Sequence, residues 1–218
     1  MAKQNAINNK SSELTIDPGA SGDSFVQFDI NGTGEFRIGV DDDDADAFVI
    51  SQGSALGTTN TFRMSAAGER TMPLQPAFSA YNSATDSNVT GDGTAYTLIC
   101  NTEIFDQNAD YDTSTGTFTA PVTGKYWLSC DYELDDIDAS HSGGYCQIVT
   151  SNRTYHGNII SPTAIDSGGN IAFHFEVLAD MDASDTATFV VQASGSAKAV
   201  DVLGGGNNVT RACGYLAV

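Results

Sequence analysis

Apolar and polar residues alternate over short segments along most of this chain, and such alternation is typical of half-buried β-strands. In the first part of the chain, Phe36, Ile38 and Val40 alternate with polar or small residues. The pair Asn31-Gly32 precedes this segment, and Asn-Gly between two such segments is a strong hairpin signal. No long stretch repeats apolar residues at helical spacing. The pattern therefore predicts an all-β protein of short strands and tight turns.

The first third of the chain divides into three parts. Residues 1–20 are polar and end in the turn sequence Asp17-Pro18-Gly19, so we predict a flexible or particle-anchoring arm. Residues 21–70 form a small β-hairpin-rich module with four predicted strands and an acidic turn at 41–46. Its Val, Ile, Leu, Met and Phe residues number only 13, so we expect it to depend on neighbouring copies or on the next domain. Residues 71–76 contain two prolines and are interpreted as a linker.

The rest of the chain, residues 77–218, has the strand density of a β-sandwich or jelly roll. The predicted strands are 77–80, 95–100, 103–105, 116–119, 124–134, 144–150, 171–177, 186–193 and 211–217. Nine to ten strands in about 140 residues predict one compact domain at the C-terminal end.

This second block carries a spaced set of aromatic, glycine, proline and acidic residues. The set is Phe105-Asp106, Asn108, Tyr111-Asp112, Gly116, Phe118, Ala120-Pro121, Gly124 and Tyr126, with a closing Gly214-Tyr215-Leu216. It resembles the signature of the head domain of the C1q/tumour-necrosis-factor (TNF) superfamily, although Cys213 stands where that family commonly has an aromatic residue. The resemblance covers about residues 75–218 and implies a ten-stranded jelly-roll sandwich, a homotrimer and a binding role. We expect the signature residues to form the core: Phe105, Tyr111, Gly116, Phe118, Pro121, Gly124, Tyr126, Gly214, Tyr215 and Leu216.

A second resemblance lies in the N-terminal module. The segment 23–40, and in style the segments 50–53 and 66–70, resemble modules of tailed-phage fibres and related virion proteins. The Gly-X-Y collagen stalk that many animal C1q proteins carry is missing. Together the two resemblances imply a bacteriophage virion structural protein: a head fibre, tail fibre, spike or capsid-decorating protein.

The chain is strongly acidic, with 28 acidic residues, 9 basic residues and a formal charge of −19. Such a surface repels phosphate backbones and anionic lipids, so we expect no nucleic-acid partner. No apolar run approaches the ~20 residues that span a bilayer, and the N-terminal segment has no apolar signal-peptide region. We therefore expect synthesis in the host cytoplasm and no membrane insertion, and the two resemblances imply a final location in the virion.

The cysteines Cys100, Cys130, Cys146 and Cys213 are widely spaced and include no CxxC pair. We expect them to be reduced and buried, behaving as small hydrophobic residues, although their redox state remains open.

Two carboxylate runs are candidate Ca²⁺ sites, because hard cations prefer oxygen ligands. One is Asp131, Glu133, Asp135, Asp136 and Asp138; the other is Asp41, Asp42, Asp43 and Asp44. The second run lacks the spaced pattern of an EF-hand loop and is also interpreted as a solvated acidic turn. We expect no other cofactor.

No HExxH, GxSxG, P-loop or GxGxxG motif occurs, and we predict no catalytic residue. The expected function is that of a non-enzymatic trimer. Its N-terminal region would contact capsid, tail or fibre proteins, and its head would contact a host-surface receptor or glycan. The alternatives are a capsid-decorating cement trimer, a bacterial C1q-like lectin or adhesin, and a carbohydrate-active enzyme.

Overall fold

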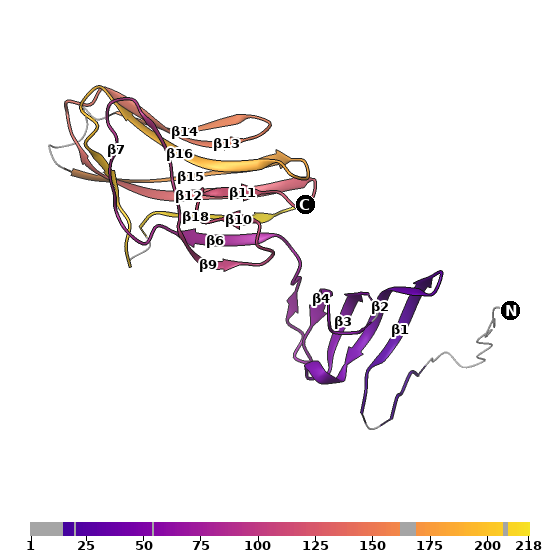
Figure 1. Cartoon of the computed structure of the whole chain (residues 1–218). Helices are drawn as coiled ribbons and strands as arrows, with labels where there is room; N and C mark the ends of the chain where they lie inside the picture. The colour runs from indigo at the N-terminus through magenta and orange to yellow at the C-terminus, as the bar shows by residue number, and fades with distance from the viewer. Residues whose placement is uncertain (1–14, 20, 54, 162–168, 207–208) are drawn as a thin grey trace. The chain divides into compact units, whose positions relative to one another are not determined.

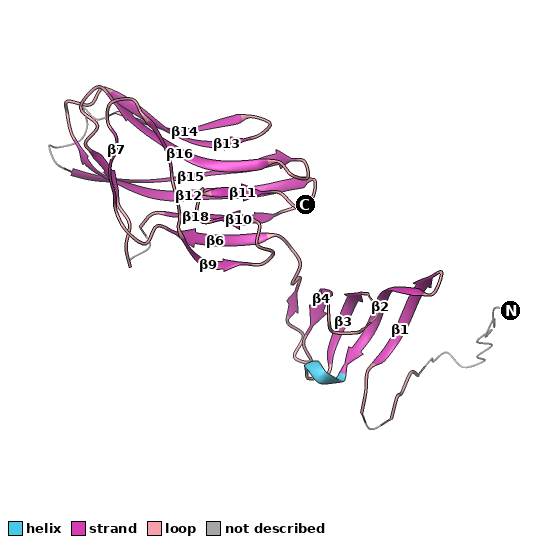
Figure 2. Cartoon of the chain, in the orientation of Figure 1, coloured by secondary structure: helices cyan, strands magenta, loops and turns pink. Residues whose placement is uncertain are grey.

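The computed structural model describes residues 15–19, 21–53, 55–161, 169–206 and 209–218. Residues 1–14 and 20 of the predicted arm therefore lie outside the described residues. The chain forms two compact units, Met1–Leu74 and Gln75–Val218, which we call the N-terminal unit and the head. Strands make up nearly all of the regular structure in both (Figure 2). No helix in the described ranges is long and apolar enough to cross a membrane.

The N-terminal unit is a single antiparallel sheet in the order β1-β2-β3-β4-β5 (Figure 1). Its strands are β1 Ser24–Ile30, β2 Thr33–Asp41, β3 Ala47–Gln52, β4 Asn60–Met64 and β5 Arg70–Thr71. The predicted hairpin at Asn31-Gly32 is confirmed: both residues have positive φ, at 59° and 82°, as a tight primed turn requires. The acidic turn contains a short 3-10 helix, Asp42–Asp44.

The core of the N-terminal unit is small. Ala47, Val49 and Leu56 are buried there, with Phe25 packed against them. These side chains form one cluster on one face of the sheet. Leu56 lies in the loop between β3 and β4 and covers Ala47 and Val49.

The head contains two antiparallel sheets (Figure 1). One has the order β10-β11-β16-β13-β14, and β8 also pairs with β16. Its strands are β8 Ala95–Thr97, β10 Tyr111–Asp112, β11 Thr117–Thr119, β13 Gly143–Thr150, β14 Thr154–Ile160 and β16 Thr186–Ser194. The other has the order β7-β17-β12-β18-β6-β9, and β15 also pairs with β12. Its strands are β6 Ala77–Tyr81, β7 Asp86–Thr90, β9 Thr102–Asp106, β12 Gly124–Ile137, β15 Gly169–Met181, β17 Val200–Val202 and β18 Arg211–Leu216.

The chain crosses repeatedly between the two sheets of the head. β12 lies in one sheet, β13 and β14 in the other, β15 returns to the first, β16 crosses again and β18 closes the fold beside β12. This is the connectivity of a jelly roll, so the predicted all-β jelly-roll sandwich is confirmed. Over the described residues the sheets have six and seven strands, more than the ten predicted, because short marginal segments such as β17 also pair.

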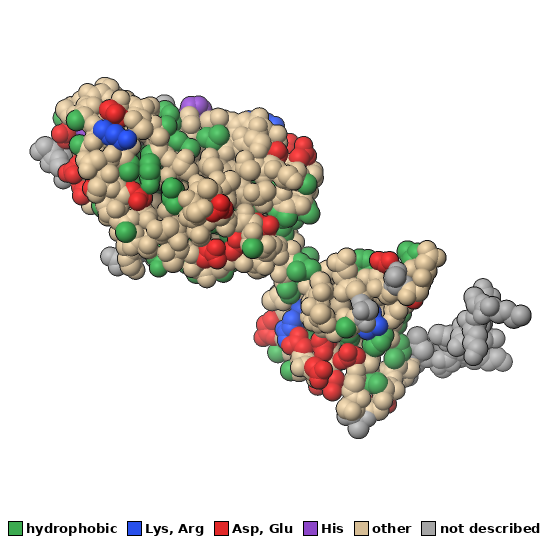
Figure 3. Space-filling model, in the orientation of Figure 1, with side chains coloured by type: hydrophobic (Ala, Val, Ile, Leu, Met, Phe, Trp, Pro, Cys, Tyr) green, Lys and Arg blue, Asp and Glu red, His purple; other side chains and the backbone are tan. Residues whose placement is uncertain are grey.

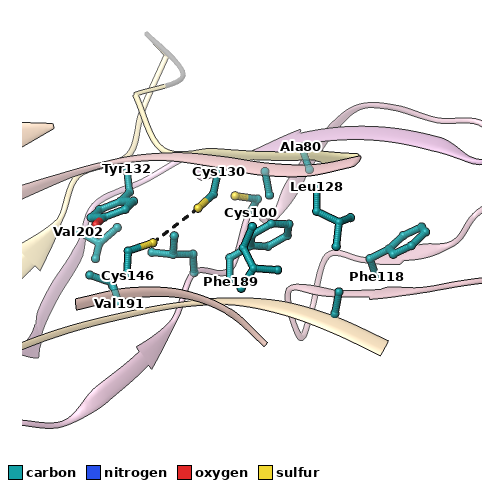
Figure 4. Close-up of a cluster of buried hydrophobic side chains, with 14 of the residues drawn as sticks. Ala80, Cys100, Phe118, Leu128, Cys130, Tyr132, Cys146, Phe189, Val191 and Val202 are labelled. Carbon is teal, nitrogen blue, oxygen red and sulfur yellow. Dashed lines mark hydrogen bonds between the residues drawn. The ribbon is translucent and has the colours of Figure 1, made fainter. Parts of the chain in front are cut away.

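The inward faces of the two sheets form one continuous hydrophobic core. Alternate residues of β12, from Tyr126 to Leu134, point into it, as the pleat of a strand requires. Phe118 is fully buried and stacks on Phe78, with 5.1 Å between ring centroids. Figure 4 shows Phe118 among other buried side chains from both sheets.

Candidate binding face

The outward side chains of the β12 sheet form the main candidate site, which we call the outer sheet face. Since Tyr126, Leu128 and Cys130 point inward, their neighbours in β12 point outward. Strand pairing places outward residues of β15, β18, β6 and β9 in register with them. The outer sheet face comprises Ser79, Phe105, Trp127, Ser129, Asp131, Glu133, His174, Glu176, Leu178, Arg211, Cys213 and Tyr215.

One row of this face is apolar. Trp127 lies opposite Leu178 on one side and opposite Tyr215 on the other. The rings of Trp127 and Tyr215 are 5.4 Å apart between centroids and tilted by 32°. Leu178 is 58% exposed and Tyr215 is 46% exposed, so the row presents contiguous apolar surface to solvent.

A second row, four residues farther along β12, is ionic. Asp131 lies opposite His174 and Arg211. The His174 Nδ1 atom lies 2.9 Å from Asp131 Oδ1, and Arg211 Nε donates to Asp131 Oδ2 at 2.6 Å. Each oxygen of the carboxylate therefore has its own cationic or polar partner.

These contacts shift the pKa values of the ionic row. Partial burial raises the pKa of Asp131, but hydrogen bonds from Arg211 and His174 outweigh it and leave that pKa below its ordinary value. The hydrogen bond to Asp131 raises the pKa of His174. Glu176, whose Oε2 atom lies 3.5 Å from His174 Nε2, raises the same pKa further. The Asp131 carboxylate is therefore ionised and holds His174 and Arg211 together by hydrogen bonds.

A shallow hollow of about 500 Å³ opens beside the ionic row. Its lining is Asp131, Tyr132, Glu133, Ala172, Phe173, His174, Val209 and Arg211. Donors from Arg211 and His174 stand next to the carboxylate of Glu133, so the hollow suits a polar ligand that both donates and accepts hydrogen bonds.

The structure separates the carboxylates of the first candidate Ca²⁺ run. Asp131 belongs to the ionic row, and Glu133 accepts a hydrogen bond from Asn170 Nδ2 at 2.9 Å. Asp138 accepts from Ser140 and contacts His141 Nδ1 at 3.0 Å. Asp135 accepts from the backbone N–H of Asp136.

The second run is also divided among separate contacts. Asp41 is buried, and this burial raises its pKa, with the charges of Asp23 and Asp44 adding to the effect. Asp44 pairs instead with Arg63, whose Nη2 donates to Oδ1 at 2.8 Å. Asp42 accepts from the backbone of Gly22, and Asp43 is exposed.

Acidic side chains (red) gather on the N-terminal unit in the face shown in Figure 3. Among the residues that the structure describes, no three His, Cys, Asp or Glu side chains are grouped so as to hold a metal ion.

The signature residues split between core and surface. Tyr111, Phe118 and Tyr126 are buried as predicted, and Gly116 and Gly214 are buried with them. Gly124 and Leu216 are half-buried, and a Cβ added at Gly124 would lie 2.5 Å from Leu216 Cδ1.

Three of the expected core residues are exposed, and for these the prediction was wrong. Phe105 is 48% exposed because it pairs with Ser79, whose neighbours Phe78 and Ala80 point inward. Tyr215 points outward because Gly214 before it faces the core. Pro121 is exposed in the turn between β11 and β12. Strand alternation therefore moves two aromatic residues from the expected core to the outer sheet face.

Sequence reasoning did not find Arg211, His174 or Leu178 as members of this face. The signal that was present lay in β12, where Trp127 stands between the inward residues Tyr126 and Leu128 and must therefore point outward. The partners of β12 come from strands far away in the sequence, and alternation within one segment does not identify them.

Comparisons with known proteins give fold-level likenesses and no family. No family model matches the chain, and no curated protein matches its sequence. Among solved structures, the globular domain of zebrafish complement 1qA protein is 14% identical, covers 66% of this chain and 98% of its own, and has a TM-score of 0.45. Murine APRIL at pH 5.0 is 12% identical, covers 65% of this chain and 98% of its own, also with a TM-score of 0.45. At these TM-scores the matches carry no argument about function, and the jelly roll rests on the strand order above.

Proposed function

We propose that this chain is a non-enzymatic structural and binding protein of a phage virion, a homotrimeric fibre or spike. In this proposal the N-terminal region attaches to capsid, tail or fibre proteins. The jelly-roll head projects outward and contacts a host-surface receptor or glycan.

The observation that carries self-association is the apolar row of the outer sheet face. Leu178, Trp127 and Tyr215 form a continuous strip across three strands, and the ionic row of Asp131 lies four residues farther along β12, beyond the row of Ser129. Aromatic and aliphatic residues at the centre with charged residues at the rim are typical of protein interfaces. The exposed Phe105 lies on the same face and extends the apolar surface. This arrangement supports burial of the outer sheet face between copies of the head.

The virion role is supported by the sequence. The segment 23–40 resembles tailed-phage fibre modules, and a net charge of −19 suits a soluble surface protein that does not bind nucleic acid. Three receptor sites on one axis would also gain avidity over a single site, by roughly 10²–10⁴-fold.

Light scattering on the purified full chain tests the trimer. We expect a mass near three times 22.8 kDa. The same measurement in EDTA tests a structural cation, because loss of the trimer would assign one to the assembly. A well-folded monomer at micromolar concentration would overturn the trimer.

Binding assays on particles and cells test the virion role. We expect the full chain to bind purified phage particles and a chain lacking residues 1–20 to lose that binding. Particles carrying chains without the head should keep their capsid stability and lose adsorption to host cells. Loss of capsid stability would favour the cement alternative. Binding to cells without any binding to particles would favour a bacterial adhesin, and release of reducing sugar from host polysaccharide would contradict a non-enzymatic role.

A further inference from the structure

One face of the N-terminal sheet is mainly apolar across four strands, with Ser24 and Gln52 as its polar members. Strand pairing puts Val26 opposite Ile38 and Phe28 opposite Phe36, and paired residues share a face. The same rule carries the face on into β3 and β4. We call this set the apolar sheet face: Val26, Phe28, Phe36, Ile38, Val40, Phe48, Ile50, Phe62 and Met64.

The apolar sheet face is largely open to solvent in the single chain. Phe28 is 57% exposed, Phe36 45%, Val26 41% and Val40 37%, and the other five members are half-buried. Since a phenylalanine side chain presents roughly 200 Å², Phe28 and Phe36 alone expose roughly 200 Å² of ring. A patch that also includes the other members is as large as the largest apolar patches that soluble monomers leave uncovered, and such patches are often functional.

The opposite face of this sheet is built differently. Its buried residues, Ala47 and Val49, are covered by Leu56. Arg37 also lies on that side, where it donates to Gln27 and stands 4.5 Å above the ring of Phe25. The N-terminal unit therefore covers one of its two faces with its own loop and charged side chains, and exposes the other.

We propose that the apolar sheet face packs against the same face of neighbouring copies of this chain. The first reason is stability. With three buried apolar residues and one packed against them, the unit has too small a core to be stable alone. Whatever packs against the apolar sheet face must therefore be present whenever the unit folds. Another copy of the same chain meets that condition, as it does in oligomers whose protomers are not stable alone.

The second reason is charge. All nine members of the apolar sheet face are uncharged, so two such faces meet without burying an unpaired ion. The acidic run at Asp41–Asp44 lies elsewhere: Asp41 is on the opposite face and Asp42–Asp44 form the turn at the sheet end. The net charge of −19 therefore does not prevent contact between the apolar faces.

The third reason is area. With strands ~4.8 Å apart and a rise of ~3.3 Å per residue, four strands of this length present roughly 450 Å² per face. Two faces then bury roughly 900 Å², a large part of the about 1,200–2,000 Å² that a stable specific interface buries, and three faces around one axis bury roughly 1,350 Å² summed over their three contacts. The apolar sheet face therefore supplies a large part of an interface between two copies, and a smaller part of each contact between three. The number three rests on the proposed function, whereas the packing of like faces does not.

A photo-crosslinking experiment on the full chain tests directly whether another copy of the chain packs on the apolar sheet face. A benzophenone-bearing phenylalanine analogue replaces Phe28, where it keeps the aromatic ring and apolar character. The matched control carries the same analogue in place of Gln27, the adjacent residue on the opposite face. We expect irradiation to produce a covalent species of twice the chain mass from position 28, at least about tenfold more than from position 27, with the link mapping to β1–β4 of the second copy.

Two outcomes would overturn the proposal. A link within one chain, from position 28 to residues 75–218, would show that the head covers this face. Absence of any protein link, with the analogue reacting only with solvent, would show that the face is open.

A substitution pair extends the test to assembly. We expect Phe28→Glu to lower the hydrogen-exchange protection of β1–β3 amides by at least about tenfold, because a carboxylate would be placed in the interface, and Gln27→Glu to change it less than about threefold. Exchange in β12 and β16 reports that the head remains folded in both variants. Equal effects of the two substitutions would count against the inference. Light scattering separates the two proposals: a wild-type monomer would sink both, a dimer with the position-28 link would sink only the proposed trimer, and a trimer without that link would sink only this inference.

Discussion

Cys130 of β12 and Cys146 of β13 face each other across the interior of the head, with 3.8 Å between their sulfur atoms (Figure 4). Both thiols are fully buried, as is that of Cys100. Cys213, in contrast, is half-buried on the outer sheet face, 3.1 Å from Ser129 Oγ. The four cysteines therefore have two different environments.

This difference predicts the order of thiol reactivity. The thiolate is the reactive form, and burial raises the pKa of Cys100 to about 12. The hydrogen bond to Cys146, together with burial, raises the pKa of Cys130. We expect a thiol reagent to label Cys213 first in the native protein and to label Cys100, Cys130 and Cys146 only after unfolding, as measured by mass spectrometry of peptides. Labelling of Cys130 at the rate of Cys213 would contradict the buried pair.

Replacement of a core ring should cost far more stability than replacement of a surface ring. Phe118 is fully buried against Phe78 and Tyr126, so Phe118→Ala should lower the free energy of unfolding of the head by about 3–5 kcal/mol. Phe105→Ala is the matched control, because that ring is 48% exposed, and it should cost less than about 1 kcal/mol in the monomer. Denaturant unfolding measures both values, and comparable losses would refute the assignment of Phe105 to the surface.

Gly116 should tolerate no side chain. Its φ is +68°, and an added Cβ would lie 2.6 Å from the carbonyl oxygen of Leu98. We expect Gly116→Ala to destabilise the head by about 1–3 kcal/mol, from the strain of the left-handed conformation and the backbone clash. Gly206→Ala serves as the control, since no atom lies within 4 Å of the corresponding Cβ position. Thermal unfolding would contradict the prediction if both variants melted at the wild-type temperature.

The contact between Asp131 and His174 predicts a small dependence of stability on pH. The folded-state pKa of His174 is raised above its unfolded value, so protonated His174 stabilises the fold. This contribution is fully present below about pH 6.5 and is lost as pH rises through the raised pKa. His174→Gln should therefore lower stability at pH 5.5, by less than about 1 kcal/mol because the pair is partly exposed, and should have little effect at pH 9.

Denaturant unfolding at the two pH values checks the His174 prediction. His156→Gln is the control, because His156 lies in the other sheet and contacts Gln147 rather than a carboxylate. A loss of stability in His174→Gln that is the same at pH 5.5 and pH 9 would remove the electrostatic explanation.

A charge in the apolar row should weaken self-association without unfolding the chain. Leu178 is 58% exposed, so Leu178→Lys should change the stability of the monomer by less than about 0.5 kcal/mol. If copies bury the outer sheet face, the same lysine should raise the dissociation constant by at least about tenfold. Thr154→Lys places the charge on an exposed residue of the other sheet and should leave association unchanged. Light scattering over a concentration series measures both, and identical curves would exclude the outer sheet face as the interface.

Several elements could be predicted from the sequence because they depend on local chemistry. The Asn31-Gly32 hairpin formed where its turn residues indicated, and alternation correctly placed Tyr126 and Phe118 in the core. The strand β14, Thr154–Ile160, was missed because its sequence is polar and contains Gly157. The structure gives the reason for that glycine: a Cβ there would lie 2.5 Å from the ring of Phe175 in β15.

The sequence alone determined most of the segments that extend, several of the turns and how acidic the chain is, since these follow from residue type and spacing along a few neighbouring residues. Only the tertiary structure decided which outward side chains meet. Asp131 contacts His174 and Arg211, which are 43 and 80 residues away, and Trp127 stacks on Tyr215. Those contacts depend on the pairing and register of distant strands around one core. Strand register is a property of the packed sheets, and no single segment carries it.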